Sequence, residues 1–188
     1  MSLRKHFIPV FLSALILISS YIFVSCIYKK APDDEKIKAE YIRAKEAYEW
    51  FEMKPMPTWE SGAKEYNGCR YFKVKHDSIK TYKDFEDYLY GLFSPYIVDG
   101  LLDAAKESKQ YIDLNGALYV LPADRGADIT RGNETYEITR VNSKKVIFRV
   151  VVEIINPDTQ KVTGYENNDF TYESLDGKWV FTKFSLVR

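Results

Sequence analysis

Histidine and cysteine are the scarcest side chains of this 188-residue chain, with two of each. Beyond residue 30 only Cys69 and His76 remain, so this part has no two-histidine metal site, no pair of cysteine ligands and no internal disulfide. The two residues lie seven positions apart on or beside one expected strand. At ~3.3 Å per residue they are too distant to act as a nucleophile and its base.

Motifs that bind phosphates or activate a serine are also missing. The chain has nine glycines, but no Gly-x-Ser-x-Gly elbow, no phosphate-binding glycine loop and no dinucleotide fingerprint. We therefore predict no catalytic residue, no metal and no cofactor, and we predict that the protein is not an enzyme.

An excess of positive charge is absent as well, because 27 basic residues balance 27 acidic ones. Four of the basic residues precede Asp33 and no acidic residue does, so the chain from Asp33 onward carries a net charge of −4. Nucleic-acid binding requires a clustered basic face. We therefore expect no nucleic-acid partner.

Long hydrophobic runs are lacking except in residues 7–28, which contain no charged side chain and follow Arg4 and Lys5. A run of this length exceeds the ~7–15 apolar residues of a signal-peptide core and reaches the ~20 that span a bilayer. Residues 1–30 are therefore predicted to be a signal or anchor segment, and residues 31–188 a single domain.

Cys26 lies near the end of the apolar run and leaves two readings open. Val24-Ser25-Cys26 resembles the site at which bacterial lipoproteins are lipidated on cysteine and cleaved, although Phe23 replaces the usual leucine. The alternative is an uncleaved transmembrane anchor in which Cys26 is one more small residue. Both readings place the domain on the extracytoplasmic face of a bacterial cell membrane, and plain secretion, the third alternative, also places it outside the cytoplasm.

The first half of the domain has helical signals. Pro32-Asp33-Asp34 is typical of a helix start, and Ile37, Tyr41, Ala44, Tyr48 and Phe51 then recur on one helical face. Thr81 with Asp84 forms a capping box, and Ser94-Pro95 starts a further helix. Residues 58–68 are expected to form a loop and residues 69–75 a short strand.

The second half has the two-residue alternation of strands. Asn115-Gly116 predicts a hairpin between residues 111–114 and 117–121. Further strands are expected at residues 136–141, 146–155, 163–173 and 178–187. We predict an α+β domain in which two to three helices pack on a curved antiparallel sheet. The expected shape is cone-like, as in cystatins or the nuclear-transport-factor-like superfamily.

Residues 122–134 form the longest expected connection of the sheet. Loops of this length in compact domains are usually functional or disordered, and this one combines two glycines with charges of both signs. The candidate partner-binding residues are Asp124, Arg125, Asp128, Arg131 and Glu134. A mobile loop without a role is the alternative.

The chain beyond residue 40 resembles the IseA-type family of DL-endopeptidase inhibitors. The matching features are turn and aromatic residues: Ala47, Trp50-Phe51, Thr81, Tyr88-Leu89, Phe93-Ser94, residues 115–120, Gly126, Asp176-Gly177-Lys178-Trp179, Phe181 and Phe184. The resemblance implies an exported inhibitor that covers the cysteine-peptidase cleft of a peptidoglycan hydrolase. A membrane tether departs from the freely secreted form of that family.

Two other functions stay open at this stage. One is a binding or scaffold module of a bacterial envelope complex with no inhibitory action. The other is an enzyme with a pocket inside the curved sheet, which would require several polar or ionisable side chains to converge there.

Overall fold

The structure is a computed structural model that describes residues 31–187 except 103–108, 124–125 and 127. The expected signal or anchor segment, with Cys26, lies outside the described residues. Among the described residues, no helix has the length and apolarity to cross a membrane. Pro32–Arg188 forms one compact unit.

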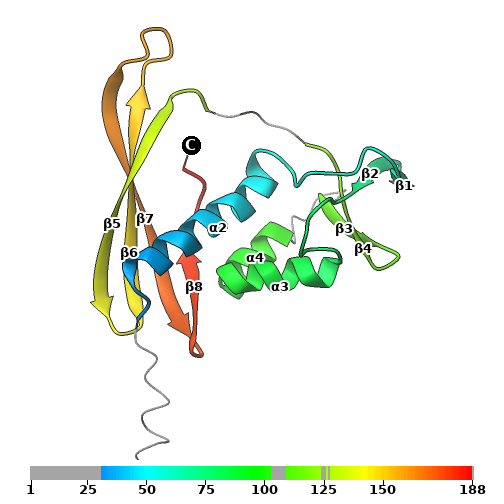
Figure 1. The fold of residues 1–188 in the computed structure, drawn as a ribbon, viewed down its shortest axis with the longest axis horizontal. Helices are drawn as coiled ribbons and strands as arrows, with labels where there is room; N and C mark the ends of the chain where they lie inside the picture. The colour runs from blue at the N-terminus through cyan, green and yellow to red at the C-terminus, as the bar shows by residue number, and fades with distance from the viewer. Residues whose placement is uncertain (1–30, 103–108, 124–125, 127, 188) are drawn as a thin grey trace, which may run out of the picture. The chain divides into compact units, whose positions relative to one another are not determined.

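The described unit is an α+β domain of three helices and two antiparallel sheets (Figure 1). The helices are α2 (Asp34–Glu52), α3 (Tyr82–Leu92) and α4 (Pro95–Leu102). The first sheet has the order β1-β2-β4-β3, with β1 (Lys64–Tyr66), β2 (Cys69–Lys73), β3 (Tyr111–Leu114) and β4 (Ala117–Val120). The second, curled sheet has the order β5-β6-β7-β8, with β5 (Arg131–Asn142), β6 (Lys145–Ile155), β7 (Val162–Leu175) and β8 (Lys178–Lys183).

Helix α2 begins where the acidic residues predicted it. Asp33 is the N-cap, and its carboxylate accepts a hydrogen bond of 2.8 Å from the backbone N–H of Lys36. Ile37, Tyr41 and Ala44 are fully buried, as expected from their spacing. Toward the end of the helix the buried side chains are Ala47 and Trp50, whereas the predicted Tyr48 and Phe51 are only partly buried.

The two helix-start signals farther along the chain are confirmed. Thr81 and Asp84 form the capping box of α3, whose core face consists of Phe85, Leu89 and Leu92. Helix α4 starts at Pro95, but of its apolar residues only Val98 is buried.

The first sheet contains a hairpin in residues that we predicted to form a loop. Strand β1 lies within residues 58–68, and Asn67-Gly68 connects it to β2 with φ angles of 49° and 75°. Asn115-Gly116 makes the same turn, with 59° and 77°, between β3 and β4. Both are left-handed turns of the kind that hairpins favour. β4 also pairs with β2, so the hairpin of β3 and β4 belongs to the first sheet and not to the curled sheet.

Two predicted strand boundaries in the second half of the domain were also wrong. Strand β5 begins at Arg131, because Arg131 pairs with Ile154, so the connection from β4 ends before Arg131. Strand β8 ends at Lys183 rather than at residue 187. The chain leaves the sheet there because Phe184 packs into the core, with its ring 4.6 Å from that of Phe170.

One hydrophobic core joins the helices to both sheets. Tyr41 of α2 lies against the curled sheet, with ring centroids 4.7 Å from Phe148 and 5.7 Å from Phe170. Phe85 of α3 lies 4.6 Å from Tyr111 of β3 in the first sheet. Aromatic rings therefore fill the space between α2 and strands β6 and β7 of the curled sheet.

Candidate functional site

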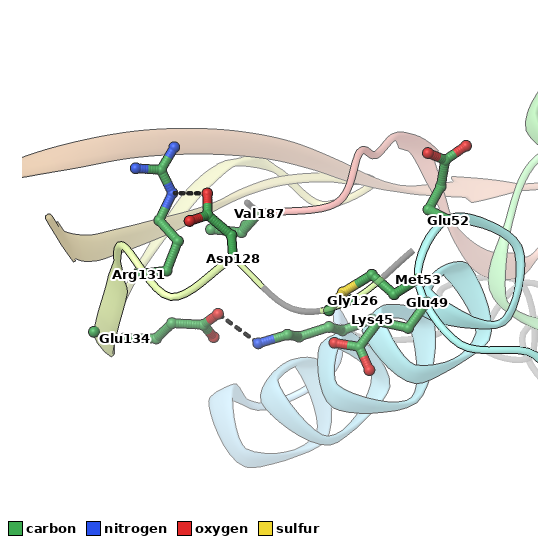
Figure 2. Close-up of a pocket in the computed structure, with 10 residues that line it drawn as sticks. Lys45, Glu49, Glu52, Met53, Gly126, Asp128, Arg131, Glu134 and Val187 are labelled. Atoms are coloured by element: carbon green, nitrogen blue, oxygen red, sulfur yellow. Dashed lines mark hydrogen bonds and ion pairs between the residues drawn. The ribbon is translucent and has the colours of Figure 1, made fainter. Parts of the chain in front are cut away.

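A pocket of about 430 Å³ lies where the start of β5 faces the second half of α2 (Figure 2). Its lining is mostly charged and comes from three parts of the chain: Lys45, Glu49, Glu52 and Met53 of or beside α2, Gly126, Asp128, Arg131, Gly132 and Glu134 in or before β5, and Val187. Four carboxylates and two cations line it, so its charge at neutral pH is net negative.

A β-bulge at the start of β5 directs two of these charged side chains to the same side. Arg131 pairs with Ile154 and Glu134 with Val152, so three steps along β5 match two steps along β6. In a regular strand, residues three apart point to opposite faces of the sheet. The extra residue of the bulge brings Arg131 and Glu134 to the same face. Arg131 and Glu134 therefore both face the pocket.

At Gly132 in this bulge, a larger residue would have to displace neighbouring side chains of β6. A Cβ atom there would lie 2.6 Å from Ile155 Cδ1 and 2.8 Å from Glu153 Oε2. The neighbouring Asn133 holds Glu153 in place through its backbone N–H and its side-chain amide, at 3.1 and 3.0 Å. The bulge thus fixes the backbone from which Arg131 and Glu134 extend.

Three donors hold Glu134 in the pocket. Its carboxylate accepts hydrogen bonds from the hydroxyls of Tyr41, at 3.2 Å, and Tyr136, at 3.1 Å. Lys45 Nζ lies 2.5 Å from its other oxygen. The Glu134 side chain is only 13% exposed, so these three donors replace the water that it has lost.

The same arrangement keeps both tyrosine hydroxyls protonated. Burial, and then the negative charge of Glu134, raise the pKa of Tyr136 to about 12. Burial and the same carboxylate raise the pKa of Tyr41 far above its ordinary value. A hydroxyl that stays protonated remains a donor, so Tyr41 and Tyr136 hold Glu134 throughout the physiological pH range.

Arg131 links the pocket to the neighbouring strand. Its Nη2 lies 2.9 Å from the Glu166 carboxylate of β7, and its Nε lies 3.9 Å from Asp128 Oδ2. The Nε atom is buried and makes no hydrogen bond, because 3.9 Å is too long for one. Asp128 accepts instead from the backbone N–H and the hydroxyl of Thr130, at 2.9 and 2.6 Å.

Glu49 is half-buried at the edge of the pocket. Burial raises the pKa of its carboxyl group, the nearby Lys45 lowers it, and the negative charges of Glu134 and Glu46 raise it further, with a net upward shift. Because Lys45 is paired with Glu134, it compensates Glu49 only in part.

Of the five predicted partner-binding residues, Asp128, Arg131 and Glu134 come together at this pocket. Asp124 and Arg125 lie outside the described residues. The contribution of α2, above all Lys45 and Glu49, was missed. The two residues are one helical turn apart beside the buried stripe, but nothing in their spacing indicates that β5 lies opposite.

Three exposed apolar side chains gather at the same end of the curled sheet, and we call them the sheet tip: Ile129, Val162 and Tyr165. They are 73%, 45% and 68% exposed, respectively. Next to Ile129, the backbone oxygen of Thr130 accepts a hydrogen bond of 2.8 Å from the N–H of Ile155 on β6. On the other side of β6, Ile155 pairs with Val162 of β7, and Glu153 pairs with Tyr165. The members of the sheet tip therefore lie at the same end of the curled sheet.

No protein-family model matches this chain, and no curated protein matches it significantly.

The histidine and the cysteine of the described residues lie apart from the pocket lining. Among them, no group of three or more His, Cys, Asp and Glu side chains lies close enough to hold a metal ion. His76 Nδ1 accepts hydrogen bonds from the backbone N–H groups of Ser78, at 3.3 Å, and Ile79, at 3.1 Å, so it supports a turn. Cys69 is a free, half-buried thiol at the start of β2.

Proposed function

We propose that this chain is an exported, membrane-tethered binding protein that inhibits a peptidoglycan DL-endopeptidase by covering its active-site cleft. It binds its partner and turns over no substrate. The tether, through residues 7–28 as a single-pass anchor or through lipidated Cys26, confines inhibition to hydrolases near the extracytoplasmic face of the membrane. The cone-like fold of cystatins and the nuclear-transport-factor-like superfamily is the finer fold that we propose for the curled sheet and its helices.

The observation that carries this proposal is the sheet tip. Isolated apolar residues on a surface are ordinary, but an exposed tyrosine grouped with exposed isoleucine and valine is typical of protein-binding surfaces. Tyr165 supplies a large, stiff anchor of the kind that dominates binding energy, and Ile129 and Val162 are exposed at the same end of the sheet.

Ordered charges border the sheet tip and support the same proposal. Glu153, which Asn133 holds, lies on the same face of the sheet as Tyr165, and Arg131 pairs with Glu166 on the opposite face, where the pocket lies. Charges that are already positioned lose little side-chain entropy when a partner arrives. Asp128 and Arg131, which we predicted to bind a partner, lie on the pocket face at this end of the sheet.

The direct test is a titration of the fragment 31–188 into the catalytic domain of a DL-endopeptidase while hydrolysis of a stem peptide is followed. The fragment contains the whole described core, which begins at Ile37. We expect saturable inhibition, and we expect Tyr165→Ala to raise the inhibition constant at least about tenfold, as for a buried aromatic anchor.

Tyr96→Ala is the matched control, because Tyr96 is 87% exposed but lies on α4. It should leave inhibition unchanged if the sheet tip is the inhibitory surface. Hydrolysis that continues at saturating fragment, with tight binding demonstrated separately, would contradict inhibition.

A second candidate is a scaffold module that binds an envelope protein without inhibiting a hydrolase. It is favoured by a groove of about 520 Å³ between α2, α4 and the C-terminal segment, with an apolar wall of Tyr48, Tyr96, Ile97, Leu101 and Phe184. If the protein is a scaffold module, Tyr96→Ala should weaken binding of the envelope partner. Tyr165→Ala should leave that binding unchanged, which is the opposite of the pattern expected for inhibition.

A further inference from the structure

One face of the first sheet carries three lysines, and we call it the lysine face: Lys64 of β1, Lys73 of β2 and Lys75 just beyond β2. Lys64 pairs with Tyr71, and Lys73 pairs with Tyr119. Paired residues of neighbouring strands, and alternate residues of one strand such as Tyr71 and Lys73, point to the same side of a sheet. Lys64 and Lys73 therefore project from the same face.

Trp59 connects this face to Lys75. An antiparallel bridge joins Thr58 to Val74, so Trp59 lies opposite Lys73, and the N–H of Trp59 donates to Lys73 O at 3.0 Å. The ammonium group of Lys75 lies over the Trp59 ring, 4.9 Å from the ring centroid. Lys75 therefore projects from the same face as Lys73.

The positive charges of the lysine face have no counter-charge within the part of the chain that the structure describes. Lys64, Lys73 and Lys75 form no ion pair with a described carboxylate, whereas Lys45 and Lys145 each do. Ammonium groups that share one face repel one another, and an anion bound among them offsets that repulsion. The face is thus a positive patch on a domain whose net charge is negative.

Aromatic rings hold two of the three ammonium groups in position. Lys64 Nζ lies 5.0 Å from the centroid of the Tyr119 ring, and Lys75 Nζ lies over Trp59. A cation is attracted to the negative face of an aromatic ring at such distances. Because these ammonium groups are already placed, little side-chain entropy is lost when an anion binds to their outward side.

The three lysines form a row, which suits a linear chain of anionic groups. Lys73 and Lys75 are alternate residues of one chain segment, so their Cα atoms are ~6.7 Å apart at ~3.3 Å per residue. Lys64 extends the row from the neighbouring strand. A chain that repeats its negative charge at about this spacing meets each ammonium group without removing it from its ring.

The kind of cation on this face favours phosphate over carboxylate. Arginine binds planar carboxylates through two parallel hydrogen bonds, whereas lysine binds phosphate as a point charge. The face has lysines alone, because Arg70, the nearest arginine of β2, alternates with Tyr71 and projects from the opposite face.

The rings and the margins of the face distinguish among phosphate-bearing partners. Bases of a nucleic acid stack on free aromatic rings, but the Tyr119 ring is only 5% exposed and Lys75 covers one side of Trp59. A flat anionic bilayer would also approach Glu60 and Asp77, which are exposed beside Trp59 and two residues beyond Lys75. A narrow chain that follows the row of lysines avoids both carboxylates.

We propose that the lysine face binds a linear phosphodiester polymer whose repeating unit is a small polyol or sugar. Charge complementarity, the row of lysines and the covered rings select this partner. The site uses neither the sheet tip nor the pocket between α2 and β5. It is therefore independent of the inhibition proposed above, and either proposal can fail alone.

The test is isothermal titration calorimetry of the fragment 31–188 with short chains of poly(glycerol phosphate). We expect a dissociation constant of about 1 mM or tighter at about 50 mM salt. The logarithm of the binding constant should fall with the logarithm of the salt concentration, with a slope of about −2 for three phosphate contacts. Absence of saturable binding, or binding that does not depend on salt, would overturn the proposal.

Lys73 lies in the middle of the row and is the residue to replace. Lys73→Gln should raise the dissociation constant roughly three- to tenfold, as for the loss of one lysine near a phosphate surface, and Lys73→Arg should retain most of the affinity. Lys144→Gln is the matched control, because Lys144 is exposed in the turn between β5 and β6 and its replacement removes the same charge. Equal weakening by both glutamine variants would show that net charge alone drives binding, which would overturn the proposal.

Three other anionic probes test the chemistry of the partner: polyglutamate and oligothymidylate with the same number of charges, and vesicles of phosphatidylglycerol. We expect each to bind more weakly than poly(glycerol phosphate), because of the missing arginines, the covered rings and the marginal carboxylates, respectively. Tighter binding of any one of them would overturn the assignment to a polyol or sugar phosphate chain.

Discussion

The carboxylate of Glu134 is the group through which α2 and β5 meet at the pocket. It accepts from Tyr41 and Tyr136 and pairs with Lys45, and its side chain is largely removed from water. A buried carboxylate with several donors is costly to disturb, because each donor left without an acceptor loses its hydrogen bond as well.

Glu134→Gln should therefore lower the free energy of unfolding by about 1–3 kcal/mol, since the amide keeps the shape but leaves Lys45 partly buried without its counter-charge. Urea denaturation measures this. Glu137→Gln is the control on the same strand. Its side chain is 63% exposed and 3.7 Å from Arg149, so the change should be within about 0.5 kcal/mol. Equal effects of the two variants would show that the buried network contributes nothing.

Tyr136 makes the same network sensitive to alkaline pH. Its pKa is about 12 in the folded protein and about 10 in an unfolded chain, so the folded state holds the proton more tightly. The stabilisation is complete below about pH 10 and is lost as the pH rises toward about 12. Urea midpoints at about pH 8 and about pH 11 should differ less in Tyr136→Phe than in the parent protein. An identical pH dependence in the two proteins would contradict this role.

At the scale of the element, the bulge in β5 decides which side chains face the pocket. The inserted residue turns Arg131 to the same side as Glu134, and Gly132 allows β6 to approach closely. The bulge thus sets the direction of Arg131, and Gly132 leaves room for the side chains of Glu153 and Ile155 on β6.

Gly132→Ala should destabilise the protein by about 1–3 kcal/mol, because the added methyl group clashes with Ile155 and with Glu153, which Asn133 holds in place. Gly164→Ala is a close control, since it also lies in a strand but has no atom within 4 Å of the added Cβ. Comparable urea midpoints for the two variants would mean that the bulge adapts without cost.

At the scale of the whole molecule, one core includes residues from both sheets. Leu118 and Val120 of β4 belong to the same buried cluster as Val146 and Phe148 of β6. Phe184, which lies beyond the last strand, packs against Phe93 at 5.3 Å and Phe181 at 5.1 Å in that cluster. A shared core implies that the two sheets unfold together.

Phe184→Ala should therefore lower the stability of both sheets by the same amount, about 3 kcal/mol or more for a large buried ring. Native-state hydrogen exchange of β4 and β6 amides measures this directly. A loss confined to β6 would show that the first sheet is a separate folding unit.

The signals that predicted the fold correctly are local ones. The capping box of Thr81 and Asp84 and the turn at Asn115-Gly116 depend on residues within three positions of each other. The turn at Asn67-Gly68 is chemically the same, but the strand before it has only three residues. So short a strand shows too little alternation to be recognised without its partner.

The sequence by itself determined the helix starts, the hairpin between β3 and β4, most of the strands and the α+β class, because caps, turns and periodicity act over a few residues. Only the tertiary structure decided that the hairpin pairs with β2 and that Glu134 turns toward α2. Tyr41 and Glu134 are 93 residues apart. Such a contact depends on how two elements pack and on a single extra residue in β5, and neither is encoded in a local pattern.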